Sequence, residues 1–268
     1  FNQNLSPAIK PALGIEVFHN FTLLHDDIMD DAPLRRGWQT VHTKWNPNIA
    51  ILSGDTMLIH AYQLMFEVPA EVLKKSLDVF SKTAVEVCEG QQWDMDFEER
   101  DDVTISEYLK MIEYKTAVLL AGALKIGALT GGANEEKAQH LYEFGRNMGI
   151  AFQLKDDLLD VFGEQDKFGK QVGGDILSNK KTYLYLKSLA IAEGKQKEEL
   201  QHWFSSKEYD GTQKVKGVKA LYERLEIKKI TTDLMNEYHQ KAMTHLQEIE
   251  GDKSELEQFA AMLLQRES

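Results

Sequence analysis

Apolar residues recur along this chain mostly every three or four positions, which is the spacing of helices rather than of strands. The segment from Pro11 to about Asp31 predicts a helix that Pro33 ends. Its apolar stripe is formed by Val17, Phe21, Leu24 and Ile28. The pattern therefore predicts an all-α fold.

A second helix is predicted around Gly149 to Phe162. The connection after it is rich in glycine and carries Lys167 and Lys170. It does not match a P-loop, since its glycines are spaced too widely and Gln171 stands where a hydroxyl residue should follow the lysine. Two readings stay open: a mobile surface loop, or a segment that closes over a polyanion.

Composition favours a single domain over residues 1–268. The chain has 5 Pro and 18 Gly and no linker-like stretch, and its 43% hydrophobic content can form a sizeable core. A net charge of -12 argues against nucleic-acid binding, which needs concentrated basic surface. One cysteine excludes an intrachain disulfide framework, and no apolar run reaches the roughly eighteen residues of a membrane span. We therefore expect a cytoplasmic protein without a transmembrane segment.

Two aspartate clusters of the same form, DDIMD and DDLLD, carry the main chemical signal. The carboxylates are Asp26, Asp27, Asp30, Asp156, Asp157 and Asp160. On a helix, positions i, i+1 and i+4 fall within a sector of about 100°, so three carboxylates could converge on a hard cation. One such cluster alone is typical of a solvated helix face. The pair, set in apolar helical sequence, predicts a metal site and hence an enzyme.

The residues around the clusters extend this hypothesis. His19 and Thr22 precede Asp26 by about two turns and one turn, and Gln153 lies one turn before Asp156. Arg35 and Arg36 follow the first cluster. Because cations are also favoured at a helix C-terminus, the arginines have a purely structural alternative.

Further motifs in a fixed order make the chain resemble the trans-isoprenyl diphosphate synthases, the polyprenyl synthetase family that includes farnesyl and geranylgeranyl diphosphate synthases. DDIMD with its Arg-Arg-Gly tail resembles the family's first aspartate-rich motif, and DDLLD resembles the second. The motifs between and after them are Thr40-Val41-His42, Gly54-Asp55, Gly90-Gln91, Lys115-Thr116, Phe152-Gln153, Gly169-Lys170, Gly173, Asp175 and Lys180. The resemblance implies the isoprenoid synthase fold, a bundle of many helices around a central cavity.

The resemblance also implies roles for individual residues. The six aspartates would be direct or water-mediated ligands of Mg²⁺, with three ions expected when substrate is bound. Contacts to the allylic diphosphate would come from Arg35, Lys115, Thr116, Gln153, Lys180 and, when the loop closes, Lys170. His19 and Arg36 would hold isopentenyl diphosphate, the second substrate. A homodimer is also expected by resemblance.

The implied reaction is ionisation of the allylic diphosphate, condensation with isopentenyl diphosphate and loss of a proton. Departing diphosphate is a better-placed proton acceptor than the metal-bound carboxylates, so no protein general base is assigned. In the family, bulky groups five and eight positions before the first aspartate stop chain growth, and these are Phe21 and Phe18 here. Thr22 is smaller than the second aromatic residue of many farnesyl synthases, which favours a C20 product over C15. Ordinary helix packing is the alternative role for both phenylalanines.

The chain departs from the family pattern at its start, where the GKxxRP motif that binds isopentenyl diphosphate is absent from the sequence. We therefore expect a polyprenyl synthetase domain that lacks the family's N-terminal segment. Two alternatives remain. A terpene cyclase shares the scaffold but usually has a different second metal motif, and a non-catalytic partner subunit would be expected to lose some aspartates or the arginine pair.

Overall fold

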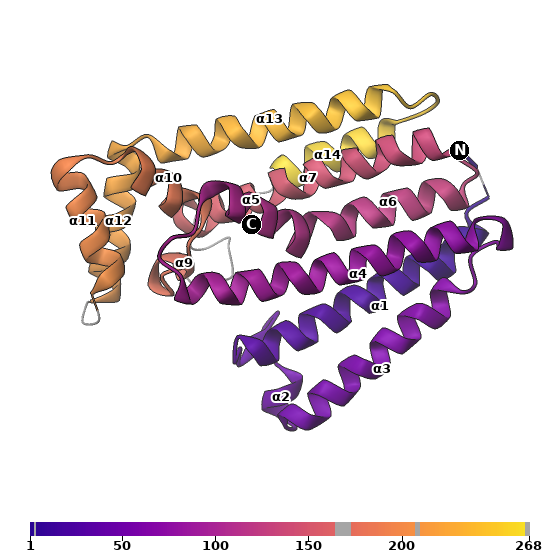
Figure 1. Ribbon diagram of the computed structural model, residues 1–268, viewed down its shortest axis with the longest axis horizontal. Coiled ribbons are helices and arrows are strands. Elements are labelled where there is room, and N and C mark those ends of the chain that lie inside the picture. Colours follow the sequence, from indigo (N-terminus) through magenta and orange to yellow (C-terminus); the bar gives the residue numbers. More distant parts are fainter. Residues whose placement is uncertain (3, 164–172, 207–209, 266–268) are drawn as a thin grey trace. The chain divides into compact units, whose positions relative to one another are not determined.

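The structure is a computed structural model that describes residues 1–2, 4–163, 173–206 and 210–265, and these residues are mostly helical (Figure 1). The all-α prediction is confirmed. The described chain divides into two compact units, Phe1–Val85 with Leu119–Tyr142, and Glu86–Val118 with Glu143–Ser268. Each unit is considered by itself, and a single domain over residues 1–268 stays a prediction.

The first unit contains a helix pair and a short hairpin. Its elements are α1 (Ser6–Met29), β1 (Leu34–Arg35), β2 (Trp38–Gln39), α2 (Val41–Lys44), α3 (Pro47–Met65), the first part of α4 (Ala70–Glu99), most of α6 (Val118–Thr130) and the start of α7 (Glu135–Phe162). α1 and α3 lie side by side (Figure 1). Gly14 permits this approach, because a Cβ there would lie 3.1 Å from the Ala61 carbonyl oxygen.

Helix α1 differs from the prediction in both its ends and its buried face. It ends at Met29, before Pro33, in a Schellman motif: Ala32 N–H donates to the Asp27 carbonyl, and Asp31 has a left-handed φ of 46°. Its buried residues are Pro11, Gly14, Phe18, Phe21 and Asp27. The predicted apolar stripe was therefore wrong by part of a turn, because the helix presents the face that carries Gly14 to α3.

A hairpin follows α1 directly. Leu34 pairs with Gln39 and Arg35 with Trp38, so Arg36 and Gly37 form a two-residue turn. Both turn residues have positive φ, 53° and 80°, as a type I′ turn requires. The turn places Arg35 on a strand that faces the end of α1, and it holds Arg36 in a conformation that costs a non-glycine residue about 1 kcal/mol.

The second unit contains the rest of α4 and α7 and all later helices. Its further elements are α5 (Ile105–Ile112), the π-helical turn η1 (Glu113–Ala117), α9 (Gly174–Leu177), α10 (Tyr183–Ile191), α11 (Gly194–Ser205), α12 (Gly211–Arg224), α13 (Ile227–Gln247) and α14 (Ser254–Gln265). The predicted helix around Gly149 to Phe162 is the C-terminal half of α7. α7 begins earlier than predicted because Asn134 accepts the Lys137 N–H and so caps it.

Two close backbone approaches fix η1 between α4 and α7. A side chain at Gly90 on α4 would collide with the backbone of Tyr114 and Lys115, and one at Gly149 on α7 would collide with Ala117. A capping box between Thr104 and Glu107 starts α5, which leads into η1. π-helical turns occur often at functional sites. Glycine at these two positions therefore lets the Lys115-Thr116 pair lie against both neighbouring helices.

Candidate functional site

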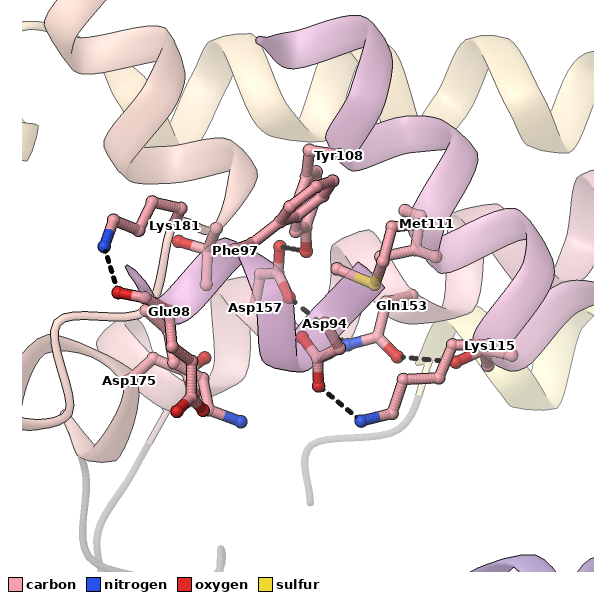
Figure 2. Close-up of a pocket in the computed structure, with 14 residues that line it drawn as sticks. Asp94, Phe97, Glu98, Tyr108, Met111, Lys115, Gln153, Asp157, Asp175 and Lys181 are labelled. Carbon is pink, nitrogen blue, oxygen red and sulfur yellow. Dashed lines mark hydrogen bonds and ion pairs between the residues drawn. The ribbon is translucent and has the colours of Figure 1, made fainter. Parts of the chain in front are cut away.

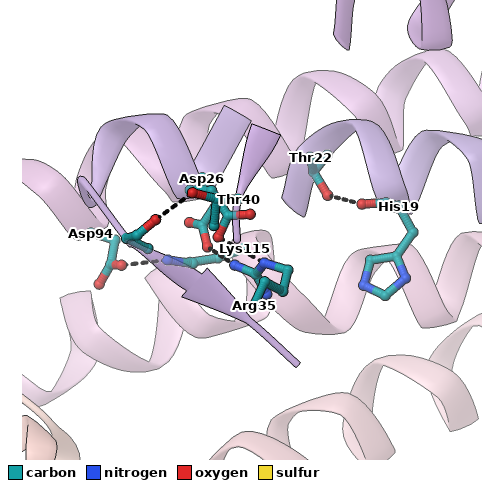
Figure 3. A network of polar contacts seen from close by, with 9 residues as sticks. His19, Thr22, Asp26, Arg35, Thr40, Asp94 and Lys115 are labelled. Atoms are coloured by element: carbon teal, nitrogen blue, oxygen red, sulfur yellow. Dashed lines mark hydrogen bonds and ion pairs between the residues drawn. The ribbon is translucent and has the colours of Figure 1, made fainter. Parts of the chain in front are cut away.

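The first aspartate cluster occupies the last turn of α1, and an arginine binds two of its carboxylates. Asp27 is buried and accepts Arg35 Nε at 2.7 Å, while Asp26 accepts the Arg35 Nη2 at 3.3 Å (Figure 3). Asp30 is exposed at the C-cap. Adjacent carboxylates repel each other, so the guanidinium lowers the cost of placing them together. Arg35 thus has a structural contact whether or not it also binds a ligand.

The other residues predicted near this cluster have separate surroundings. The Thr22 hydroxyl donates to the His19 carbonyl at 2.8 Å, so it is directed to its own helix rather than to the carboxylates (Figure 3). His19 is half-buried on α1, and Arg36 is exposed at the hairpin turn. In the first unit the structure therefore brings only Arg35, of these four residues, into contact with the aspartates.

The two phenylalanines of α1 belong to a chain of aromatic contacts. The Phe18 and Phe21 ring centroids lie 5.6 Å apart, Phe18 is 5.3 Å from Phe80, and Phe21 is 4.8 Å from the His25 ring. Both phenylalanines are buried. These contacts are those of ordinary core packing, so a role in limiting product length stays a prediction.

The second aspartate cluster lies on the last two turns of α7, and its middle residue is almost fully enclosed. Asp157 is 3% exposed and accepts the Tyr108 hydroxyl at 2.5 Å and Gln153 Nε2 at 3.3 Å (Figure 2). The Thr116 hydroxyl donates to Gln153 Oε1 at 3.2 Å. The amide of Gln153 therefore links the η1 hydroxyl to Asp157, four residues later, and not to Asp156 as predicted.

Burial is the main cause of an unusual titration at Asp157. It raises the pKa of this carboxyl to about 7, and the charge of Asp175 adds to the rise. Hydrogen bonds from Tyr108, Gln153 and the Tyr183 backbone act in the opposite direction. Burial and the nearby Asp157 also raise the pKa of Tyr108, so its hydroxyl keeps its proton and remains a donor.

Five of the site residues predicted from the sequence line one pocket of the second unit: Lys115, Thr116, Gln153, Asp157 and Lys180. Others that contribute are Asp94, Phe97, Tyr108, Met111, Asp175 and Lys181 (Figure 2). The pocket has a volume of about 100 Å³ and is lined mainly by charged and polar side chains, so it suits a small polar group and not a long hydrocarbon. The structure thus gathers lysines from η1 and from the segment after α9 at one place.

Asp94 is the main residue of this pocket that the sequence did not reveal. Its carboxylate receives the Lys115 ammonium at 2.5 Å. An acidic run such as that from Asp94 to Asp102 is typical of a solvated face or loop, but Asp94 lines the pocket instead. The available signal was its position one turn after Gly90, the glycine that brings α4 against η1. Tyr108 had no comparable sequence signal.

Asp160 connects the second cluster to the segment that follows the glycine-rich connection. Its Oδ2 accepts the Asp175 backbone N–H at 3.1 Å, and its carbonyl accepts the Gly173 N–H at 2.7 Å. Lys167 and Lys170 lie outside the described residues. In the part of the chain that the structure describes, no three His, Cys, Asp or Glu side chains are grouped closely enough to hold one ion.

Fold and site together define an all-α protein with acidic clusters at the ends of two helices and a lysine-bearing pocket. The Polyprenyl synthetase family profile matches residues 2–225. Geranylgeranyl diphosphate synthase of Methanosarcina mazei is 49% identical over 185 residues, 68% of this chain and 57% of that protein. The corresponding enzyme of Sulfolobus acidocaldarius is 43% identical over 188 residues, 69% of this chain and 57% of that protein.

Solved structures agree with the sequence comparison. A geranylgeranyl pyrophosphate synthase crystal structure matches with a TM-score of 0.92 and 47% identity, over 98% of this chain and 82% of the other. The geranylgeranyl pyrophosphate synthetase of Pyrococcus horikoshii gives a TM-score of 0.92 and 36% identity, over 99% of this chain and 82% of the other. The chain belongs to the polyprenyl synthetase family and has its isoprenoid synthase fold.

The matched regions cover only part of the length of the curated relatives. The chain spans less than two thirds of the length of the curated relatives that it matches. Among the described helices, we find none with both the length and the apolar character needed to cross a lipid bilayer.

The raised pKa of Asp157 predicts a pH-dependent stability. Between about pH 4 and pH 7 the folded carboxyl holds a proton that the unfolded chain has released, so its contribution to stability falls as the pH rises. The shift from 3.8 to about 7 corresponds to about 4 kcal/mol. Relative to the original chain, Asp157→Asn should therefore gain stability across this range, measured by urea unfolding without added metal. The exposed Asp101→Asn is the control, and a difference for Asp157→Asn that did not change with pH would contradict the assignment.

Proposed function

We propose that this chain is the catalytic part of a trans-prenyltransferase that condenses an allylic diphosphate with isopentenyl diphosphate, head to tail. The observation that carries the proposal is the pocket that gathers Lys115, Thr116, Gln153 and Lys180 from segments far apart in sequence. Family membership supports it, since relatives are named geranylgeranyl, geranylfarnesyl and short chain isoprenyl diphosphate synthases.

The pocket suits the diphosphate end of the allylic substrate. Lys115, Lys180 and Lys181 all line it, and ammonium groups are good point-charge partners for phosphate oxygens. Asp94 holds the Lys115 ammonium in place before substrate arrives, and Gln153 is held between Thr116 and Asp157. Such pre-ordered donors stabilise charge on a leaving group without reorganising during the reaction.

The clusters have suitable oxygens for Mg²⁺, and the contacts refine which residues would hold it. Asp26, Asp30, Asp156 and Asp160 are at least partly exposed, whereas Asp27 and Asp157 are buried against protein donors. Carboxylate oxygens are the ligands that Mg²⁺ prefers. Bound magnesium would neutralise the charge that develops on the departing diphosphate. We therefore assign the four outer carboxylates to the metal and the two middle ones to support of the site.

The second substrate would use the remaining basic groups. His19 and Arg36 are proposed to hold isopentenyl diphosphate, and the exposed, left-handed Arg36 is available to a ligand at the hairpin turn. No protein base is assigned to the final proton loss, because departing diphosphate can accept it. Water must be excluded from the site, because it would otherwise capture the carbocation and give an alcohol.

A product assay tests this function directly. The full-length protein, incubated with geranyl diphosphate, isopentenyl diphosphate and Mg²⁺, should form a longer linear diphosphate, with the C20 compound as main product by mass spectrometry. Lys115→Met should lower kcat/KM by about a hundredfold or more, because it removes a preorganised charge. A hydrocarbon product would instead support a cyclase, and no turnover would support a non-catalytic partner subunit.

Product length tests the role of Phe21 separately. Removing its ring should deepen the space along α1 and shift the product beyond the length made by the original chain, which we propose to be C20 in preference to C15. Phe21→Ala is compared with Leu13→Ala, a change at an exposed position of the same helix. The products are separated by chromatography. An unchanged product distribution for Phe21→Ala would exclude Phe21 as a residue that limits product length.

An apolar stripe on the first unit supports a homodimer. Leu52 and Ile59 on α3 and Phe66 just after it are 66%, 59% and 57% exposed, and they are spaced seven residues apart. This spacing places them in one line along a helix, as at a helix–helix seam. Large exposed apolar surface of this kind usually marks an interface. A second copy of the chain is the partner that we propose.

Sedimentation tests the dimer. Ile59→Lys should place a charge in the seam and shift the sedimentation equilibrium mass toward that of one chain. Met262→Lys, at a similarly exposed apolar position on α14, should leave the mass unchanged. A dimer that persists unweakened with Lys at position 59 would exclude this stripe as the interface.

A further inference from the structure

Lys214 on α12 is a fully buried lysine, which is rare for this residue type. Its Nζ donates to Asn179 Oδ1 at 2.5 Å and lies 5.3 Å from the centroid of the Phe204 ring. Burial lowers the pKa of Lys214, the expected effect of removing an ammonium group from water. A buried ammonium group must donate to protein acceptors, and the Asn179 side chain is one acceptor of Lys214.

Asn179 follows the last residue of α9, Leu177, by two positions. Its φ is 55°, in the left-handed region, and it forms the turn position of a Schellman motif. Lys180 N–H donates to the Asp175 carbonyl at 2.9 Å, and Asn179 N–H donates to the Ile176 carbonyl at 3.2 Å. The conformation of Asn179 therefore determines the direction in which the chain continues into Lys180.

The other end of α9 is also anchored. Asp160 accepts the Asp175 N–H, and Gly173, at a φ of 85°, lies so close to α12 that a Cβ would stand 2.7 Å from the Val215 side chain. A helix of four residues has no stability of its own. Its position is thus set by α7 and α12 at its start and by Lys214 of α12 after its end, and both Asp175 and Lys180 line the pocket.

We propose that Lys214 is a positioning residue for Lys180: its ammonium group fixes the Asn179 amide, and Asn179 in turn directs Lys180 into the diphosphate pocket. This inference rests on the proposed function of that pocket. Neither Lys214 nor Asn179 was among the residues predicted from the sequence. Lys214 does not line the pocket, so it acts through the turn at Asn179 and not by touching substrate.

Binding of inorganic diphosphate in the presence of Mg²⁺, measured by calorimetry, tests the proposal without requiring turnover. Lys214→Met keeps the length and burial of the side chain but removes its donor, and it should raise the Kd for diphosphate about tenfold. Asn179→Gly, which accommodates the left-handed turn but lacks the amide, should have a similar effect. Lys216→Met, at an exposed position of the same helix, is the matched control and should bind as the original chain does.

A double-substitution cycle separates positioning from general stability. If Lys214 acts through Lys180, adding Lys214→Met to Lys180→Met should change the Kd less than about twofold, while the melting temperature falls as in Lys214→Met alone. Effects on Kd that multiply would overturn the proposal, as would unchanged diphosphate binding by Lys214→Met or no binding by the original chain. Diphosphate binding that follows this pattern in a protein without prenyltransferase activity would refute the proposed function alone.

Discussion

The pocket depends on the hydrogen bonds that the buried side chain of Asp157 accepts. It accepts the Tyr108 hydroxyl of α5, the Gln153 amide of its own helix and the Tyr183 backbone N–H at the start of α10. Through Gln153 it also orders Thr116 on η1. A buried acid is costly unless its partners are in place, so these elements are stable only in the arrangement that also forms the pocket.

The two aspartate clusters use the same sequence pattern with different support. Asp27 is buried against the guanidinium of Arg35, eight residues later on a hairpin, whereas Asp157 is buried against a neutral tyrosine and an amide. Burial raises the pKa of Asp157 and favours its protonated form, whereas Asp27 is paired with a cation. In each cluster the middle carboxylate is therefore buried against protein groups, and the outer carboxylates stay at least partly exposed.

The sequence predicted the helical class, the end of α7 and five of the residues that line the pocket, because helical periodicity and the order of short motifs are local signals. It did not predict Asp94 or Tyr108, since their roles arise only when α4 and α5 pack against η1 and α7. The buried stripe of α1 was wrong because Gly14, a residue without a side chain, decides which face meets α3. The buried Lys214 resembled any other lysine of an amphipathic helix until its position against Asn179 was known.

The division of each cluster into outer metal ligands and a middle supporting residue is the central claim, and the Mg²⁺ dependence of product formation tests it most directly. Asp26→Asn and Asp156→Asn should raise the Mg²⁺ concentration for half-maximal activity about tenfold or more, because each removes a charged ligand. Asp27→Asn and Asp157→Asn should alter unfolding but leave that concentration within about twofold. Equal shifts for the middle and outer substitutions would contradict the account.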